Sequence, residues 1–360
     1  MKNTHPRFLY YPQHEAYYKM YPVFRPFVYW VNEPMFSSAF VNTDVNGLRN
    51  NYLSDGTLID IKLLKKRFDC CDIIVGGSTV FGVDASSDKQ TISFHLSEDN
   101  VPCINLGNRG ATSFQELNLF IVNQVFFPKI RNIYILSGVN NCSLASLDGS
   151  IIYDEYGGIF GQDYYMTQTY MSNLSVCYDN LSYNRFRFYN AIERRYRDNK
   201  LFRTLLGFFV SKAFKSEPIK NVLADKRKGF DKKVEQLVTN LDNELKVWRA
   251  LADKHDANIH YFLQPCMFWN NKLLSKLEKE CYNEDLKLFP TMELYANKEF
   301  HLKYTEALKG IMQENKIPYY NSNEVFDNLE EDKTVFTDVC HLTDYGNKIV
   351  ANFILKKIRQ

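Results

Sequence analysis

The sequence lacks the apolar run of roughly 18 residues that a membrane-spanning helix requires, although 45% of its 360 residues are hydrophobic. Its first residues, Met1 to Pro6, also lack the apolar core of a secretory signal. No C-x-x-C pair occurs, and the seven histidines show no spacing typical of zinc ligands. We therefore expect a cytoplasmic, soluble protein with neither a metal nor an organic cofactor.

Nucleotide-binding motifs are missing as well. The glycine-containing segment 77–82 has no Lys-Ser/Thr of a phosphate-binding loop, and no G-x-G-x-x-G follows a predicted strand. Val80 stands where the nucleophile elbow of an α/β-hydrolase would need glycine, two residues after Ser78. The net charge of +2 favours no class of partner, and nucleic acid binding is not expected.

The side-chain composition is that of a globular protein with many aromatic residues. The chain has 27 Phe, 24 Tyr and 3 Trp, which biased genome composition largely explains, with sugar-stacking or lipid-facing surfaces as the alternative. Eight cysteines lie outside any metal-binding pattern, several of them in apolar runs. They are predicted to be buried free thiols.

The clearest element is the stretch 70–82, Cys-Cys-Asp-Ile-Ile-Val-Gly-Gly-Ser-Thr-Val-Phe-Gly. An apolar, β-branched run that ends in two glycines and a serine is typical of a buried parallel strand that enters a tight turn. Ligands and catalytic groups gather at this edge of a parallel sheet. Ser78 is therefore a candidate nucleophile.

Further strands and helices alternate along the chain. Strands are predicted at 101–107, 132–137, 258–265 and 317–320. Helical spacing follows Ser113 and Glu116, which have the spacing of a capping box, and recurs at 234–251, at 298–314 and after Thr343 as N-cap. This alternation predicts an α/β protein, a three-layer α/β/α sandwich with a parallel central sheet.

Two regions stand outside this alternation. Residues 1–66 are expected to form an extension packed on the main domain, which comprises 67–147 and 229–360. Within the extension, 40–49 is similar to a hairpin that turns at Asn46-Gly47, and Arg49 is expected to have a structural role. Residues 148–228 form a basic, aromatic-rich and mostly helical insertion.

The insertion has three interpretations. Its part 185–228 is rich in Lys and Arg, and cations flank the apolar segment 201–210. This segment either packs on the main domain with solvated charges, covers the site as a lid, or lies on an anionic membrane surface. The last would make the protein peripheral to a membrane.

Four short blocks supply what acyl transfer requires. Ser78 offers a nucleophile, Gly110 a backbone N–H group at a turn, and Asn140 a side-chain amide. An Asp three residues before a His on one loop can orient an imidazole as a base, and Asp338 with His341 has this spacing.

These blocks, in this order, resemble the SGNH hydrolases, also called the GDSL esterase family. The resemblance covers about residues 70–147 and 258–358, and it implies that Ser78 N–H, Gly110 N–H and the Asn140 amide form the oxyanion hole. Two departures concern the subfamily: Gly-Asp-Ser of the family is here Gly76-Gly77-Ser78, and Gly-x-Asn-Asp is Gly138-Val139-Asn140-Asn141.

The resemblance implies a serine esterase, with Ser78, His341 and Asp338 as catalytic residues. The expected substrate is an acylated small molecule or glycan, with an O-acetyl group on a carbohydrate as the first choice. Transfer of the acyl group to a glycan hydroxyl is the second hypothesis, and an inactive glycan- or membrane-binding protein the third. The sequence leaves the natural substrate and the oligomeric state open.

Overall fold

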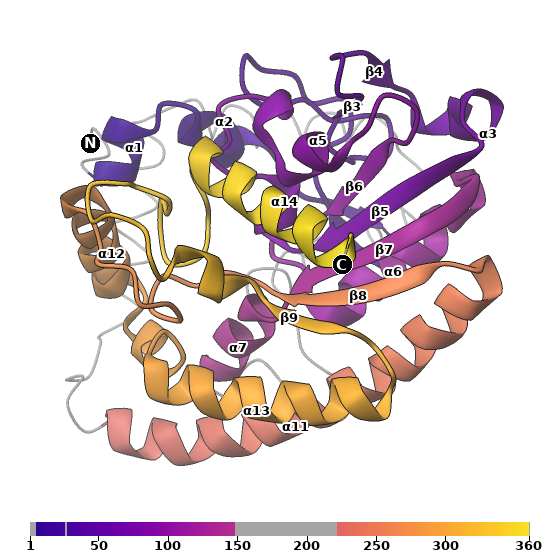
Figure 1. Cartoon of the computed structure of the whole chain (residues 1–360). Coiled ribbons are helices and arrows are strands. Elements are labelled where there is room, and N and C mark those ends of the chain that lie inside the picture. Colours follow the sequence, from indigo (N-terminus) through magenta and orange to yellow (C-terminus); the bar gives the residue numbers. More distant parts are fainter. Residues whose placement is uncertain (1–4, 26, 148–221, 360) are drawn as a thin grey trace, which may run out of the picture. The chain divides into compact units, whose positions relative to one another are not determined.

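The computed structural model describes residues 5–25, 27–147 and 222–359 (Figure 1). The predicted insertion therefore lies almost wholly outside the described residues, and so does its apolar segment 201–210. Within the described part, no helix is both long enough and apolar enough to cross a membrane. The seven described cysteines are free thiols, and all but Cys70 are buried.

A five-stranded sheet forms the centre of the molecule (Figure 1). Its strands are β5 (Cys70–Gly76), β6 (Cys103–Gly107), β7 (Lys129–Ser137), β8 (Asn258–Leu263) and β9 (Tyr319–Asn321). They lie in the order β6-β5-β7-β8-β9, and every neighbouring pair is parallel. This is the doubly wound order in which the chain starts near the middle and later turns outward. The predicted fold class is confirmed.

Helices cover both faces of the sheet because successive side chains of a strand point to opposite sides. Ile73 and Val75 of β5 belong to the core beneath one set of helices, while Ile74 belongs to the core on the other face. The first set comprises α6 (Ser113–Asn123), α7 (Val139–Ser146), α11 (Val222–His255) and α13 (Lys298–Glu314). On the opposite face lie α5 (Ile92–Leu96) and α14 (Asp344–Ile358), the latter drawn in yellow (Figure 1).

Short elements make up the N-terminal extension and the connections. The extension contains α1 (Pro6–Tyr10), α2 (His14–Lys19), β1 (Val23–Arg25), β2 (Tyr29–Val31), β3 (Asn51–Tyr52), β4 (Leu58–Ile59), η1 (Ile61–Leu63) and α3 (Leu64–Arg67). Later come α4 (Ser78–Phe81), η2 (Asp88–Gln90), η3 (Gln124–Phe126), α12 (Lys276–Leu288), η5 (Pro290–Leu294) and η6 (Ser322–Phe326). Strands β1 and β2 pair with each other, as do β3 and β4, both antiparallel.

The turn predicted at Asn46-Gly47 is present, but no ladder of paired strands flanks it. Gly47 has φ +84°, and the Asp44 carboxylate accepts hydrogen bonds from the N–H groups of Asn46 and Leu48. One isolated antiparallel bridge joins Thr43 and Arg49. The side chain of Asp44 thus holds this turn in place of strand pairing.

Arg49 has the structural role expected of it. Its side chain is fully buried and donates to Asp88 at 2.8 Å, to Tyr17 at 2.6 Å and to the carbonyl of Gly82 at 2.8 Å. The guanidinium also lies 5.4 Å from the ring centroids of Tyr17 and Phe81. Arg49 therefore joins the extension to the turn after α4, with its charge compensated by Asp88.

The capping box predicted at Ser113 and Glu116 is wrong by one residue. Thr112 is the N-cap of α6 and Gln115 its partner. Both pairs fit the capping-box pattern, but Gln115 makes the bond, accepting from Thr112 N–H at 2.9 Å, while Glu116 points into the core and is 2% exposed.

Helix α12 has no counterpart among the predicted elements, and a buried ion pair anchors it. Glu278 accepts from Lys272 Nζ at 2.8 Å, and both side chains are fully buried. Its other oxygen accepts from the N–H groups of Val335 and Phe336 at 2.9 and 3.1 Å. Glu278 thereby fixes the segment that leads into the loop of Asp338 and His341.

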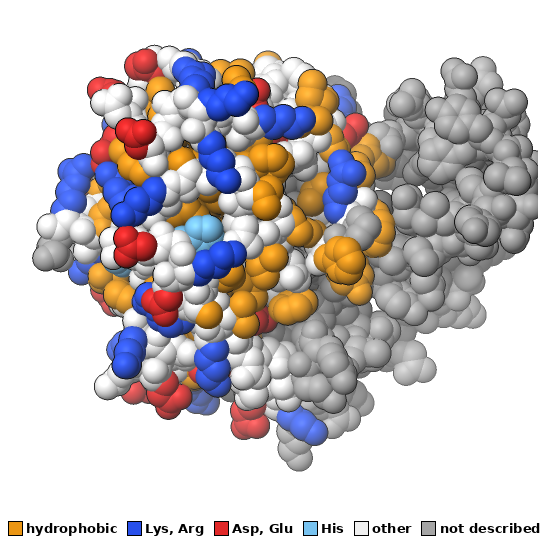
Figure 2. All heavy atoms as spheres, turned by 90° about the vertical axis from the view of Figure 1, so that its right-hand side faces the viewer, with side chains coloured by type: hydrophobic (Ala, Val, Ile, Leu, Met, Phe, Trp, Pro, Cys, Tyr) orange, Lys and Arg blue, Asp and Glu red, His pale blue; other side chains and the backbone are white. Residues whose placement is uncertain are grey.

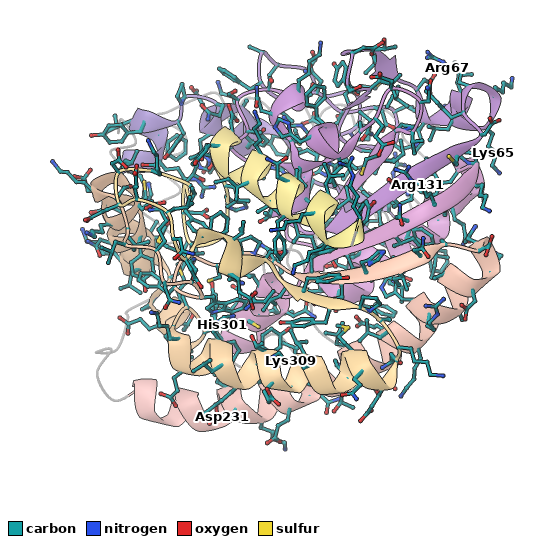
Figure 3. All side chains as sticks on the ribbon, viewed as in Figure 1. Lys65, Arg67, Arg131, Asp231, His301 and Lys309 are labelled. Carbon is teal, nitrogen blue, oxygen red and sulfur yellow. The ribbon has the colours of Figure 1, made fainter. Side chains whose placement is uncertain are left out.

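The face at the amino ends of the strands carries charges of both signs. Lysine and arginine side chains alternate there with acidic and hydrophobic ones (Figure 2). Arg131 lies at this end with Lys65 and Arg67 (Figure 3) and pairs with Asp72 at 2.6 Å. The carboxyl ends of the strands, where the candidate residues lie, form the opposite end of the sheet.

Two carboxyl groups are buried on the α6 side of the sheet. Burial raises the pKa of Glu116 to about 8 and that of Glu244 of α11 to about 7, against the opposing effect of hydrogen bonds with Ser137 and Ser113. A carboxyl whose folded pKa exceeds its unfolded value stabilises the fold below the unfolded pKa, and this contribution is lost as the pH rises through the folded pKa. Stability should therefore fall between about pH 5 and pH 8.

We expect Glu116→Gln to remove part of this pH dependence. The variant keeps a polar group for Ser137 but has no proton to lose, so it should be more stable than the wild type at pH 9 by on the order of 2 kcal/mol, with little difference at pH 5. Denaturant unfolding at pH 5, 7 and 9 measures this. Glu235→Gln, at an exposed position of α11, is the control. The same pH dependence in Glu116→Gln and wild type would contradict the prediction.

Candidate active site

Ser78 lies where the first strand of the sheet meets its first helix. Strand β5 ends at Gly76, and Ser78 is the first residue of α4. The first N–H groups of a helix have no partner within it, so the N–H of Ser78 is available to a ligand. The residue is 8% exposed, which leaves its hydroxyl accessible only over a small area.

A chain of hydrogen bonds joins Ser78 to His341 and Asp338. Ser78 Oγ lies 2.6 Å from His341 Nε2, and His341 Nδ1 lies 2.5 Å from Asp338 Oδ2. A carboxylate can only accept, so Nδ1 carries the proton in this arrangement and Nε2 accepts from the hydroxyl of Ser78. This is the tautomer in which an imidazole can take the proton of a serine.

Hydrogen bonds within the loop of Asp338 and His341 fix its conformation. Asp338 Oδ1 accepts from the N–H groups of Cys340 at 2.9 Å and His341 at 2.7 Å. Burial acts to raise the pKa of Asp338, but the charges of Arg7 and His341 and these hydrogen bonds outweigh it and hold the pKa well below its ordinary value. Asp338 is therefore ionised throughout the neutral range.

Contacts with two strand ends place this loop over Ser78. Thr79, next to Ser78, donates its hydroxyl to the carbonyl of Cys340 at 2.9 Å. Gln264, directly after β8, donates to Thr79 Oγ1 at 2.7 Å. The hydroxyl of Thr79 thus links the loop of Asp338 and His341 to the ends of both β5 and β8.

Asn140 and the loop after β6 complete the surroundings of Ser78. Asn140 Nδ2 donates to the carbonyl of Ala111 at 2.7 Å, which uses one of its two N–H bonds. A Cβ atom added at Gly77 would lie 2.3 Å from this nitrogen, so the amide packs against the backbone beside Ser78. Gly110 has φ +70°, a conformation that glycine adopts without strain.

The two departures from the family motifs now have structural explanations. A side chain at position 77 would meet the amide of Asn140, whose nitrogen lies 2.3 Å from the place of a Cβ atom, so glycine leaves this amide where it is. Asn141 has a separate role, since its side chain accepts from Ser113 N–H at 3.0 Å and donates to Ser113 Oγ at 2.6 Å. It thereby holds the start of α6 beside the Gly110 loop.

Two charged residues near the site were not among the predicted ones. Arg7 of α1 forms an ion pair with Asp338 and another, at 2.6 Å, with Asp84. Asp84 lies in the turn after α4 and also accepts from Thr337 Oγ1 at 2.6 Å. No spacing in the sequence signals these contacts, because Arg7 meets its partners only in the folded protein.

Among the described residues, Asp338, Cys340 and His341 are the group whose ligand atoms could reach one metal ion, all within 4.8 Å of one another. The donor set does not suit a metal ion. Burial raises the pKa of the Cys340 thiol well above its ordinary value, so the thiol stays protonated. Both ring nitrogens of His341 already have partners, and the guanidinium of Arg7 adds positive charge.

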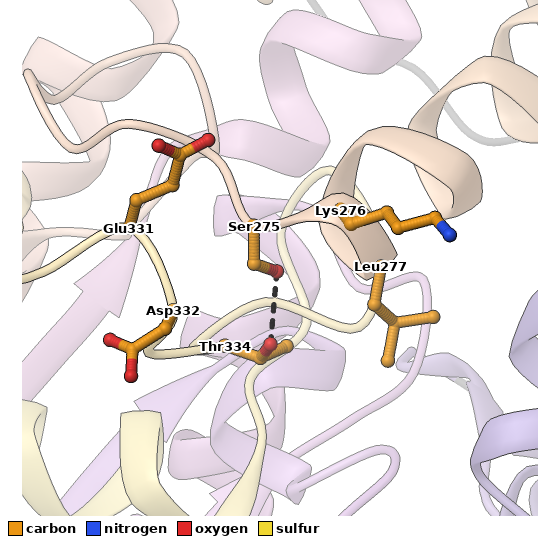
Figure 4. Close-up of a pocket in the computed structure, with 6 residues that line it drawn as sticks. All are labelled: Ser275, Lys276, Leu277, Glu331, Asp332 and Thr334. Atoms are coloured by element: carbon orange, nitrogen blue, oxygen red, sulfur yellow. Dashed lines mark hydrogen bonds between the residues drawn. The ribbon is translucent and has the colours of Figure 1, made fainter.

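A surface pocket of about 490 Å³ lies elsewhere, at the start of α12 (Figure 4). Ser275, Lys276, Leu277, Glu331, Asp332 and Thr334 line it, and the hydroxyls of Ser275 and Thr334 lie 2.9 Å apart. Ser275 also caps the helix in a capping box with Glu278. The side chains of Ser275 and Glu278 thus already bind backbone N–H groups at the start of α12. We assign the pocket no ligand.

No protein-family model and no curated protein matches the sequence. Solved structures do align with the chain. An acetyl xylan esterase, AlAXEase, is 10% identical, covering 80% of this chain and 99% of its own with a TM-score of 0.37. The carbohydrate acetylesterase Est24 from Sinorhizobium meliloti is 11% identical over 80% of this chain and 98% of its own, with a TM-score of 0.37.

A third structure is described as a member of the lipolytic G-D-S-L family, from Veillonella parvula. It is 13% identical and covers 81% of this chain and 99% of its own, with a TM-score of 0.35. Its family is the one that the sequence motifs resemble. Because these identities and TM-scores are low, the fold assignment rests on the strand order, and the function on the geometry around Ser78.

Proposed function

We propose that this protein is a serine hydrolase of the SGNH type that acts on esters. The observation that supports it is the hydrogen-bond chain from Ser78 Oγ to His341 Nε2, at 2.6 Å, and from His341 Nδ1 to Asp338, at 2.5 Å. A serine hydroxyl is a weak nucleophile until an adjacent base removes its proton. An imidazole beside the hydroxyl of Ser78, with a carboxylate on its other nitrogen, supports this proposal.

The proposed reaction has two steps. Ser78 Oγ attacks the acyl carbon while its proton passes to His341 Nε2, and the ester bond then breaks as the leaving alcohol takes that proton. Water next attacks the acyl group on Ser78, again giving a proton to His341, and the acid leaves as Ser78 regains its hydrogen. The N–H groups of Ser78 and Gly110 and the free N–H of Asn140 are the proposed donors to the oxyanion in both steps.

A small acyl group is the proposed substrate, most specifically an O-acetyl group on a carbohydrate. Ser78 is 8% exposed and the His341 side chain 15%, so little room is available at the reacting atoms. The aromatic side chain of Phe114, three residues after Ala111, is half exposed and offers a surface on which a sugar ring can stack.

Transfer of the acyl group to a sugar hydroxyl is the second candidate. The narrow access to Ser78 bears on it, because a sugar bound at the entrance would keep water from the acyl-enzyme while presenting its own hydroxyl. Hydrolysis and transfer share the first step and differ only in the acceptor. The ratio of free acetate to acetylated sugar, measured with added sugars, separates them.

Labelling by a fluorophosphonate probe tests the proposal. We expect covalent labelling of the wild type at Ser78, identified by peptide mass, together with release of nitrophenol from p-nitrophenyl acetate at least about tenfold faster than from p-nitrophenyl octanoate. Heat-denatured protein is the control for non-specific labelling. A folded wild type that takes up no probe would count against a serine hydrolase and in favour of a binding protein.

A further inference from the structure

Arg7 contacts both Asp338 and His341, at the Nδ1 edge of the imidazole where these two residues meet. Its Nη1 forms an ion pair with Asp338 Oδ2, and its Nη2 lies 2.9 Å from His341 Nδ1. The third nitrogen, Nε, donates to Asp84 Oδ2 at 2.6 Å. Arg7 is 8% exposed, so these interactions are little screened by solvent.

The charge and the donors of the Arg7 guanidinium determine what these contacts can do. A guanidinium has only donors, so Nη2 cannot accept the N–H of Nδ1, and its 2.9 Å approach to the ring is an electrostatic contact while Nδ1 donates to Asp338. A fixed positive charge 2.9 Å from the ring is unfavourable to a positively charged imidazole and favourable to the Asp338 carboxylate. The same guanidinium also compensates the charge of Asp84. Burial of two carboxylates, those of Asp84 and Asp338, requires a cation that pairs with both.

We propose that Arg7 is a positioning residue of the active site, whose fixed charge keeps Asp338 ionised and so holds the His341 ring in the orientation that faces Ser78. This inference rests on the proposed function and extends it to the N-terminal extension. Helix α1 is then part of the catalytic apparatus, because it supplies the cation that sets the lower pH limit of activity.

Other titratable groups surround Arg7 from every element packed on it. Asp84 accepts from His14 Nδ1 of α2 at 2.7 Å, and Asp285 of α12 lies 3.1 Å from His5 Nε2. The remaining titratable groups near Arg7 in the described part are Tyr11, Cys281 and Cys340. Arg7 is the member of this cluster that carries a positive charge at every pH of interest.

The test is the pH dependence of Ser78 labelling by the fluorophosphonate, which needs no knowledge of the natural substrate. Removing the cation raises the pKa of Asp338, so the carboxylate that orients His341 becomes protonated at a higher pH. This moves the acid limb of the labelling rate to higher pH. We expect the midpoint of that limb to rise by about one pH unit or more in Arg7→Gln. Arg7→Lys should keep the midpoint near the wild-type value but label more slowly, because an ammonium cannot bridge both carboxylates.

A second variant predicts the opposite sign. Asp84→Asn removes an anion that Arg7 now compensates, so the acid limb should move to lower pH. His5→Asn is the matched control at the N-cap of α1: asparagine can still cap the helix, where His5 accepts from Arg7 N–H, while the contact of His5 Nε2 with Asp285 is lost. Its midpoint should stay at the wild-type value.

The outcomes separate the two proposals. A wild type that is labelled, with folded Arg7→Gln and Asp84→Asn variants whose acid limbs coincide with it, would overturn the role of Arg7 and leave the hydrolase standing. A wild type that is not labelled at any pH would overturn both. Unfolding temperatures show whether each variant is folded. If Arg7→Gln does not fold, the shift expected for Asp84→Asn still tests the role of Arg7.

Discussion

Replacing Ser78 or His341 by alanine is expected to lower kcat/KM for p-nitrophenyl acetate by about 10⁴ to 10⁶-fold. The two residues are the donor and the acceptor of one proton, since the hydroxyl of Ser78 and Nε2 of His341 lie 2.6 Å apart. The Ser78→Ala, His341→Ala double variant should therefore be no slower than either single variant, because the two act as a unit. Initial rates at saturating and limiting ester measure both expectations.

Asp338→Asn is also expected to lower kcat/KM, but through the tautomer of His341. An asparagine at 338 can present N–H to His341 Nδ1, which stabilises the tautomer that cannot accept a proton from Ser78. We expect a loss on the order of 10⁴-fold. Circular dichroism and unfolding temperature establish that the variants are folded. If Ser78→Ala and His341→Ala keep the wild-type rate while folded, the observed ester cleavage comes from another site.

Gly77→Ala is expected to lower turnover by about 10² to 10³-fold, the effect of losing one oxyanion donor, while leaving stability nearly unchanged. The new methyl group would lie 2.3 Å from Asn140 Nδ2. This is the far end of a side chain that can rotate away, so the fold absorbs the change. The displaced amide, however, leaves its place beside Ser78. Turnover and denaturant unfolding, measured on the same preparation, distinguish the two effects.

Asn140→Ala is the matched comparison. If the methyl group at position 77 acts only by displacing this amide, Asn140→Ala and the Gly77→Ala, Asn140→Ala double variant should show the same loss as Gly77→Ala alone. A Gly77→Ala variant with wild-type turnover would mean that the amide of Asn140 is not used in the reaction.

Most of the sheet could be predicted because its strands are buried on both faces. Runs such as Ile73-Ile74-Val75 must be apolar at every position when helices cover both sides, and such runs are visible in the sequence. Strand ends were less well defined: β7 begins at Lys129, three residues before the predicted start. Its first residues are held by pairing with β5, which local composition does not reveal.

The residues of the candidate site also differ in whether the sequence could predict them. Asp338 and His341 are three residues apart, and their contact follows from one short loop, so a motif can indicate them. Arg7 and His341 are separated by 334 residues, and one arginine near the start of a chain has no pattern that distinguishes it. The capping box of α6 shows a third case, in which two adjacent pairs fit one rule and only the structure shows that Thr112 and Gln115 form it.

The bonds around Ser78 have a consequence for how the protein matures. Thr79 meets Cys340 across 261 residues, and Thr337 meets Asp84 across 253. Ser78, the proposed nucleophile, is therefore synthesised long before His341, its proposed base. On the proposed mechanism, reactivity appears only once the loop of Asp338 and His341 has folded against Ser78, so that activity would report a completed domain.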